Sequence, residues 1–96
     1  MGGSEDVAKQ LLASYWPDAQ RLHASIQQYV ESKDIDGLKK DVHTLKGSSQ
    51  MIKAERFGQA CYVLELAANQ EGQIEDALKN FNAEYDLLQL LILQKI

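Results

Sequence analysis

Apolar residues recur at alternating steps of three and four along most of this chain. The clearest run consists of Ile35, Leu38, Val42, Leu45, Ser49 and Ile52. Because an α-helix turns by about 100° per residue, this spacing places all of these side chains on one helix face. The same spacing recurs over residues 19–30, 57–68 and 74–92, and more briefly over 7–15. The pattern therefore predicts an all-α protein.

The breaks between these segments indicate how the helices are connected. Trp16-Pro17 is expected to end the first segment, because the residue before a proline avoids the α region and proline suits the first turn of a new helix. Asp34 is a suitable cap for the helix that follows it, and residues 69–72 form the next expected loop. Four long amphipathic helices with short loops favour an antiparallel up-down-up-down four-helix bundle, with the short first helix capping one open end.

Length and charge restrict the classes of function. A chain of 96 residues corresponds to one domain, and its net charge of −4 argues against nucleic acid or an anionic membrane as the main partner. The single cysteine, Cys61, cannot form an internal disulfide, and no apolar run reaches the roughly 20 residues needed to span a bilayer. We interpret residues 1–4 as a cloning remnant and 5–96 as a domain cut from a larger cytoplasmic protein or region.

His43 is set apart by its position on the third expected helix. It lies about 130° from the centre of the apolar stripe, so its imidazole is expected to face solvent. Lys46 follows one turn later, and Gly47 costs a mid-helix position about 1 kcal/mol relative to alanine. That cost suggests that another surface must approach the backbone closely there. A basic patch is expected around the histidine from Lys39, Lys40, Lys46, Lys53 and Arg56.

Other interpretations remain open at this point. An exposed histidine is most often merely solvated, and the protein would then be a helical adaptor with no chemistry of its own. A metal site using His23, His43 and a carboxylate is disfavoured, because the two histidines lack ligand-type spacing. The segment 87–93 is apolar on more than one face, which fits either coverage by the first two helices or a dimer contact.

The run from His43 through Lys46 and Gly47 to Ser49 resembles the signature of histidine phosphotransfer (HPt) domains of phosphorelays. The resemblance continues at Ala54, Phe57, Cys61, Leu64 and Glu65, and it extends over residues 11–69. There are two departures from the family pattern, because Lys53 stands where the family often has glycine and Gln50 where many members have a small residue. A histidine-kinase dimerisation domain is a weaker match, since Thr44 replaces the usual acid and no proline follows.

The resemblance implies a role for each matching residue. His43 would accept the phosphoryl group, Lys46 would hold its oxygens, and Gly47 would leave room for the partner. Glu65 would hold one ring nitrogen of the histidine and fix its tautomer. The remaining binding candidates are Lys39, Lys40 and Gln50, together with an apolar set, Leu12, Tyr15 and Trp16, that could instead close the end of the core.

The same resemblance implies the partners. They would be two receiver domains, one in a hybrid histidine kinase and one in a response regulator, and Mg²⁺ would be supplied by the receiver. The domain itself is expected to need no cofactor, no metal and no ATP, to contact neither nucleic acid nor membrane, and to be a monomer in isolation. Its parent would be a membrane-bound sensor kinase, with this domain at the cytoplasmic C-terminal end.

Overall fold

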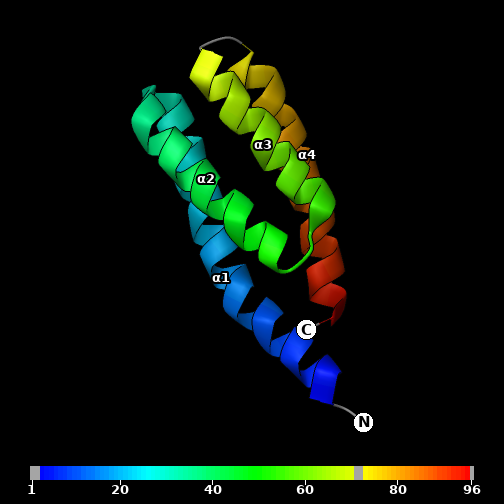
Figure 1. Cartoon of the computed structure of the whole chain (residues 1–96). Helices are drawn as coiled ribbons and strands as arrows, with labels where there is room; N and C mark the ends of the chain where they lie inside the picture. Colours follow the sequence, from blue (N-terminus) through cyan, green and yellow to red (C-terminus); the bar gives the residue numbers. More distant parts are fainter. Residues whose placement is uncertain (1–2, 71–72, 96) are drawn as a thin grey trace.

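A computed structural model describes the backbone of residues 3–70 and 73–95, and the side chains of 9–70 and 73–94. Residues 1 and 2 of the expected cloning remnant therefore lie outside the described residues, as do residues 71 and 72 of the expected loop. The described chain contains four helices and no strand (Figure 1). They are α1 (Gly3–Ser32), α2 (Ile35–Met51), α3 (Glu55–Gln70) and α4 (Ile74–Lys95).

The helices run alternately up and down and form an elongated bundle, as predicted (Figure 1). Each helix packs against its neighbours in the order α1, α2, α3, α4, and α4 closes the ring against α1 over a short stretch. The molecule measures 49 × 18 × 17 Å. The N-terminal turns of α1 extend beyond the end of the bundle at which α4 finishes (Figure 1).

The predicted division of the first helix is wrong. α1 continues through Pro17 as one helix of 30 residues, so residues 3–32 form no separate capping helix. Proline removes one backbone hydrogen bond from a helix interior, which disfavours continuation. Here Ala13, whose carbonyl is freed, is exposed like Pro17, so water can reach that carbonyl, while Tyr15, Trp16 and Ala19 are buried on either side of the proline. Burial of these flanking residues therefore outweighs the local preference of the proline.

The core is formed by the inward faces of all four helices. Its largest fully buried apolar side chains are Ile26, Leu38, Leu45, Phe57, Leu64 and Phe81. One polar residue, Ser49, is also completely buried, and its hydroxyl lies 2.7 Å from that of Tyr15. A buried hydroxyl needs such a partner, because an unsatisfied polar group costs stability. Ser49 thus occupies its place in the apolar stripe of α2 through a hydrogen bond to α1.

The turns after α1 and α2 have the same geometry. In the second turn, the amide of Ala54 donates to the carbonyl of Ser49, and the amide of Lys53 donates to that of Gln50. This pair of bonds is the Schellman motif, in which the residue after the cap adopts the left-handed conformation. Lys53 has φ of 62°, and Lys33 occupies the equivalent place after α1 with φ of 60°. The turn therefore forms with Lys53 at the position where glycine was expected.

The helix starts and ends follow the sequence closely elsewhere. The side chain of Asp34 accepts a hydrogen bond from the amide of Gly37, which confirms Asp34 as the cap of α2. α3 extends through Gln70, so residues 69 and 70 of the expected loop are helical.

A polar cluster joins α1 to α4. Asn82 accepts hydrogen bonds from Gln27 at 2.8 Å and from the ring of His23 at 2.9 Å. The His23 ring also stacks on Tyr85, with 3.7 Å between the centroids. Burial lowers the pKa of His23, although the hydrogen bond to Asn82 opposes this effect. His23 therefore belongs to the packing between the first and last helices.

Candidate functional site

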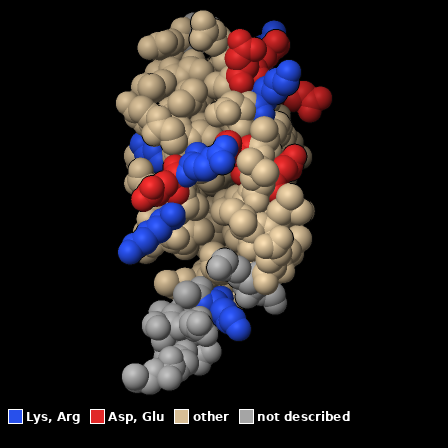
Figure 2. All heavy atoms as spheres, turned by 90° about the vertical axis from the view of Figure 1, so that its right-hand side faces the viewer, with Lys and Arg blue, Asp and Glu red and all other residues tan. Residues whose placement is uncertain are grey.

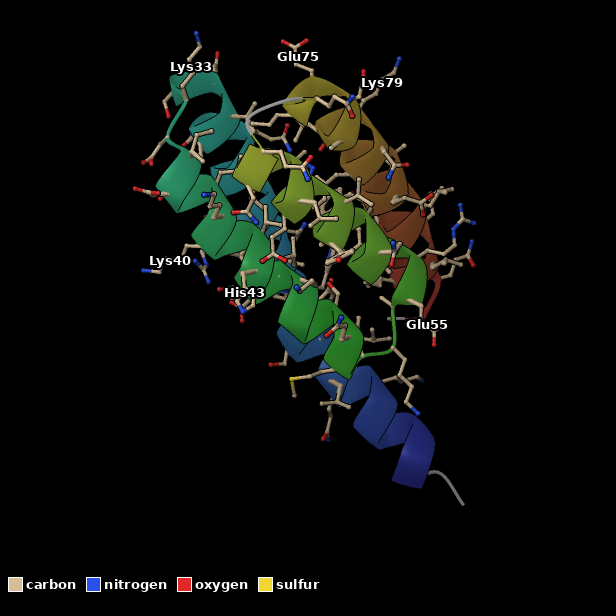
Figure 3. All side chains as sticks on the ribbon, turned by 45° about the horizontal axis from the view of Figure 1, so that its top comes forward. Lys33, Lys40, His43, Glu55, Glu75 and Lys79 are labelled. Carbon is tan, nitrogen blue, oxygen red and sulfur yellow. The ribbon has the colours of Figure 1, made fainter. Side chains whose placement is uncertain are left out.

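The middle of α2 presents His43 to solvent. Leu38, Val42, Leu45 and Ser49 form the fully buried face of this helix. The side chain of His43 is 71% exposed, which confirms the orientation predicted from the helix period. Lys40 and His43 both project from the outer side of α2 (Figure 3).

One carboxylate on α3 contacts both chemically active residues of α2. Oε2 of Glu65 lies 2.9 Å from Nδ1 of His43, and Oε1 lies 2.7 Å from Nζ of Lys46. The side chains of Glu65 and Lys46 are only 17% and 19% exposed, so both are held against the bundle. The hydrogen bond from Lys46 holds the pKa of Glu65 below its ordinary value, against the effect of burial and with a further contribution from His43. Glu65 is therefore a carboxylate at neutral pH.

The position of Glu65 follows from the apolar face of α3. Cys61, Leu64 and Ala68 are fully buried on that face, and Glu65 directly follows one of them. Its side chain thus emerges at the edge of the core, on the side where α3 packs against α2. Burial raises the pKa of the Cys61 thiol to about 12, so this cysteine is a core residue rather than a nucleophile.

This geometry selects one nitrogen of the imidazole. Because the Glu65 carboxylate can only accept, Nδ1 of His43 carries the proton in their hydrogen bond. In the neutral ring the lone pair then lies on Nε2, at the far edge from Glu65. The site thus offers a solvent-facing nitrogen nucleophile with an ammonium group beside the same carboxylate.

Tyr62 is a member of this cluster that the sequence did not indicate. Nζ of Lys46 lies 5.4 Å from the centroid of its ring, within the range of a cation–π contact. Tyr62 and Glu65 are three residues apart on α3 and therefore face the same way. The i, i+3 spacing of Tyr62 and Glu65 could have indicated that Tyr62 belongs to the site. That spacing is informative only when Lys46, on the neighbouring helix, is known to lie against both residues.

The predicted basic patch is smaller than expected. Glu65 matches the charge of Lys46, and Arg56 forms an ion pair of 2.8 Å with Glu84 of α4, away from His43. Figure 2 shows the side of the molecule that carries α4, where acidic and basic side chains are intermixed. Lys39 and Lys40, one turn before His43, remain the cations that flank it on α2.

Gly47 and Gln50 are both exposed on the His43 side of α2. A Cβ atom added to Gly47 would meet nothing within 4 Å. No neighbour within the described chain therefore requires glycine at this position. The space above Gly47 is open, and its use by a partner stays a prediction.

The three apolar docking candidates, Leu12, Tyr15 and Trp16, differ in their exposure to solvent. Tyr15 and Trp16 are 7% and 5% exposed and belong to the core, so they are not docking residues, and the alternative role of closing the core is the one observed. Trp16 stacks on Tyr85 with 5.2 Å between the ring centroids. Leu12 is half-buried and lines a shallow groove at the turn between α2 and α3. The other residues that line this groove are Leu11, Met51, Ile52 and Lys53.

None of the described helices is long and apolar enough to cross a membrane. Among the same residues, no three His, Cys, Asp or Glu side chains come together in a way that could hold a metal ion.

Fold and site together define a four-helix bundle that displays one histidine from the middle of a helix, with its inner nitrogen held by a carboxylate. A model of the Hpt domain family matches residues 10–94, and the chain therefore belongs to that family. It is thus a histidine phosphotransfer domain, a class that interacts with receiver domains in the phosphorelays of two-component signalling. No match was found among the curated proteins or the solved structures.

Proposed function

We propose that this domain is a phosphorelay intermediate in which His43 carries the phosphoryl group. It would accept the group from the aspartyl phosphate of one receiver domain and pass it to the aspartate of another. The single observation that carries this proposal is the exposed His43 ring with Nδ1 fixed on Glu65 at 2.9 Å. That arrangement directs Nε2 outward, where a receiver can reach it.

The transfer needs little from this chain beyond position and charge. Nε2 attacks the phosphorus of the aspartyl phosphate, the N–P bond forms, and the P–O bond breaks to release the aspartate carboxylate. Phosphoryl transfer passes through a loose transition state that depends on in-line placement and charge stabilisation. Glu65 would keep the ring oriented, Lys46 would stabilise the phosphoryl oxygens, and the receiver would supply Mg²⁺. The reverse reaction with a second receiver returns His43 to its original state.

The surface beside Gly47 is the proposed landing site for the receiver. Going round α2 from His43, Gly47 and Met51 lie on the side away from Glu65, about 40° and 80° from the histidine. The side chain of Met51 is 79% exposed, and with Leu11 and Leu12 it lines the groove described above. Exposed apolar side chains next to an open backbone position suit a protein contact. Lys39 and Lys40 would attract the acidic pocket of the receiver, and Gln50 would lie at the edge of the contact.

The donor would be the receiver domain of a hybrid histidine kinase, and the acceptor would be a response regulator. Such a relay operates on the cytoplasmic side of a membrane-bound sensor, which is where we place this domain.

The test is phosphoryl transfer from a panel of phosphorylated receiver domains to the wild-type domain and to His43→Gln. We expect an acid-labile, base-stable label on the wild type and none on the variant. Because His43 is exposed, the variant should keep its helicity, and its free energy of unfolding should change by less than about 0.5 kcal/mol. Circular dichroism and thermal melting check that second expectation.

The outcomes separate the proposal from its rival. A wild-type domain that stays unlabelled by every receiver, while still binding other proteins, would indicate a helical adaptor. Loss of label together with unfolding of His43→Gln would instead show that the histidine has a structural role.

A further inference from the structure

The ammonium group of Lys46 is held by two residues of α3 at once. Nζ lies 2.7 Å from Oε1 of Glu65 and 5.4 Å from the centroid of the Tyr62 ring. A lysine on a helix surface ordinarily samples many rotamers. Here the side chain is 19% exposed and is contacted from two directions. Its position is therefore set by α3 as well as by its own helix.

We propose that Tyr62 is a positioning residue for Lys46 in the transfer reaction, a role that rests on the proposed function of His43. The face of the ring attracts the ammonium group and keeps it against Glu65. Lys46 and His43 bind the two oxygens of the same carboxylate, so the ammonium group and the imidazole are both held by Glu65. From the position in which Tyr62 and Glu65 hold it, the cation would extend toward the oxygens of a phosphoryl group on Nε2.

An aromatic ring is suited to this task for an electrostatic reason. A second carboxylate at position 62 would also hold the lysine, but its charge would repel the oxygens of the phosphoryl group. The tyrosine ring attracts the cation without adding a negative charge. Glu65 and Lys46 consequently form a neutral pair next to the histidine.

Tyr62 as a residue is 43% exposed, so substitutions there should not disturb the core. The experiment compares Tyr62→Phe, which keeps the ring face, with Tyr62→Leu, which removes it. Both are made with Lys46 present and in a Lys46→Ala background. The readouts are the rate of phosphoryl transfer from a phosphorylated receiver and the carboxyl pKa of Glu65, measured by ¹³C NMR in the unphosphorylated domain.

We expect Tyr62→Leu to slow transfer about two- to fivefold. This is the change in rate that corresponds to the free energy of an exposed cation–π contact. It should also raise the pKa of Glu65 toward its ordinary value, because the hydrogen bond from Lys46 is the main cause of the lowering. Tyr62→Phe should leave both quantities near those of the wild type. In the Lys46→Ala background, Tyr62→Leu should have no further effect.

Equal behaviour of the leucine and phenylalanine variants would overturn the proposal. An effect of Tyr62→Leu that persists without Lys46 would also overturn it, since Tyr62 would then act through another contact, such as the receiver. If the wild type accepts no phosphoryl group at all, the proposed function fails. The NMR titration would still decide, independently, whether Tyr62 positions Lys46.

Discussion

At the scale of single residues, the site depends on Glu65. One oxygen of its carboxylate binds the histidine and the other binds the lysine, at 2.9 and 2.7 Å. The charges of Glu65 and Lys46 offset each other, so in the proposed reaction an incoming phosphoryl group would meet a neutral pair rather than a bare carboxylate. The same carboxylate fixes the proton of His43 on Nδ1. Orientation and charge balance are therefore both provided by one side chain on the neighbouring helix.

Gly47 provides a way to separate docking from chemistry. Gly47→Gln should stabilise α2 by up to about 1 kcal/mol, because glycine is a poor helix former and nothing lies within 4 Å of the new Cβ. The longer side chain should nevertheless slow transfer from a receiver, because it fills the space that the partner needs. Thermal melting and transfer kinetics measure the two effects.

The control for Gly47→Gln is labelling by phosphoramidate, a small phosphodonor that needs no docking surface. Its rate should match that of the wild type. Equal slowing with phosphoramidate would mean that the substitution disturbs His43 itself. Unchanged transfer from the receiver would remove Gly47 from the docking surface.

At the scale of helices, local sequence preferences are overruled at two kinds of position. Pro17 lies inside α1, and lysines occupy the left-handed positions after α1 and α2, with φ near 60° at both Lys33 and Lys53. The turn of Lys53 is fixed because Phe57 and Leu45, on either side of it, are buried in the same core. Packing of the helices thus imposes a backbone conformation that lysine does not favour.

Replacing these lysines by glycine should therefore stabilise the domain. Lys53→Gly is expected to raise the free energy of unfolding by about 0.5–1 kcal/mol, because glycine adopts positive φ without a steric cost. Lys79→Gly, on the exposed face of α4, is the matched control and should lower stability by about 1 kcal/mol. Urea denaturation measures both changes. Destabilisation by both substitutions would contradict our interpretation of the turn.

The sequence predicted most features that depend on one helix at a time. The apolar spacing predicted the helical segments, although α1 was wrongly divided at Pro17, and the same wheel placed His43 on the outside of α2. Features that depend on two helices were not predictable in this way. The contact of Tyr62 with Lys46 and the turning of Arg56 toward Glu84 both require the rotation of α3 against its neighbours. The period of apolar residues along one helix gives no information about that rotation.

At the scale of the whole molecule, the core and the site are separate. The buried side chains of all four helices form the scaffold, and the reactive residues lie on the outer surface of α2 and α3. Such a domain can lose its chemistry without losing its fold. The bundle is closed where α1 meets α4, and His23, stacked on Tyr85, lies in that contact.

The closing contact should make stability depend on pH. Burial lowers the pKa of His23 in the folded state below the unfolded value of 6.5. The unfolded chain therefore binds the proton more readily, and the contribution of neutral His23 is lost as the pH falls below about 6.5. The melting temperature of the wild type should decrease on acidification from about pH 7.5 to 5.5 by more than that of His23→Gln. Parallel curves for the two proteins would contradict this assignment.

NMR of the ¹⁵N-histidine-labelled domain tests whether His43 carries the phosphoryl group on Nε2, as we propose. The domain is phosphorylated by a receiver, and ¹⁵N–³¹P coupling then identifies the nitrogen that is bonded to phosphorus. We predict coupling to Nε2 of His43, with Nδ1 still protonated and bound to Glu65. Phosphorus on Nδ1, on His23 or on no histidine would contradict the account.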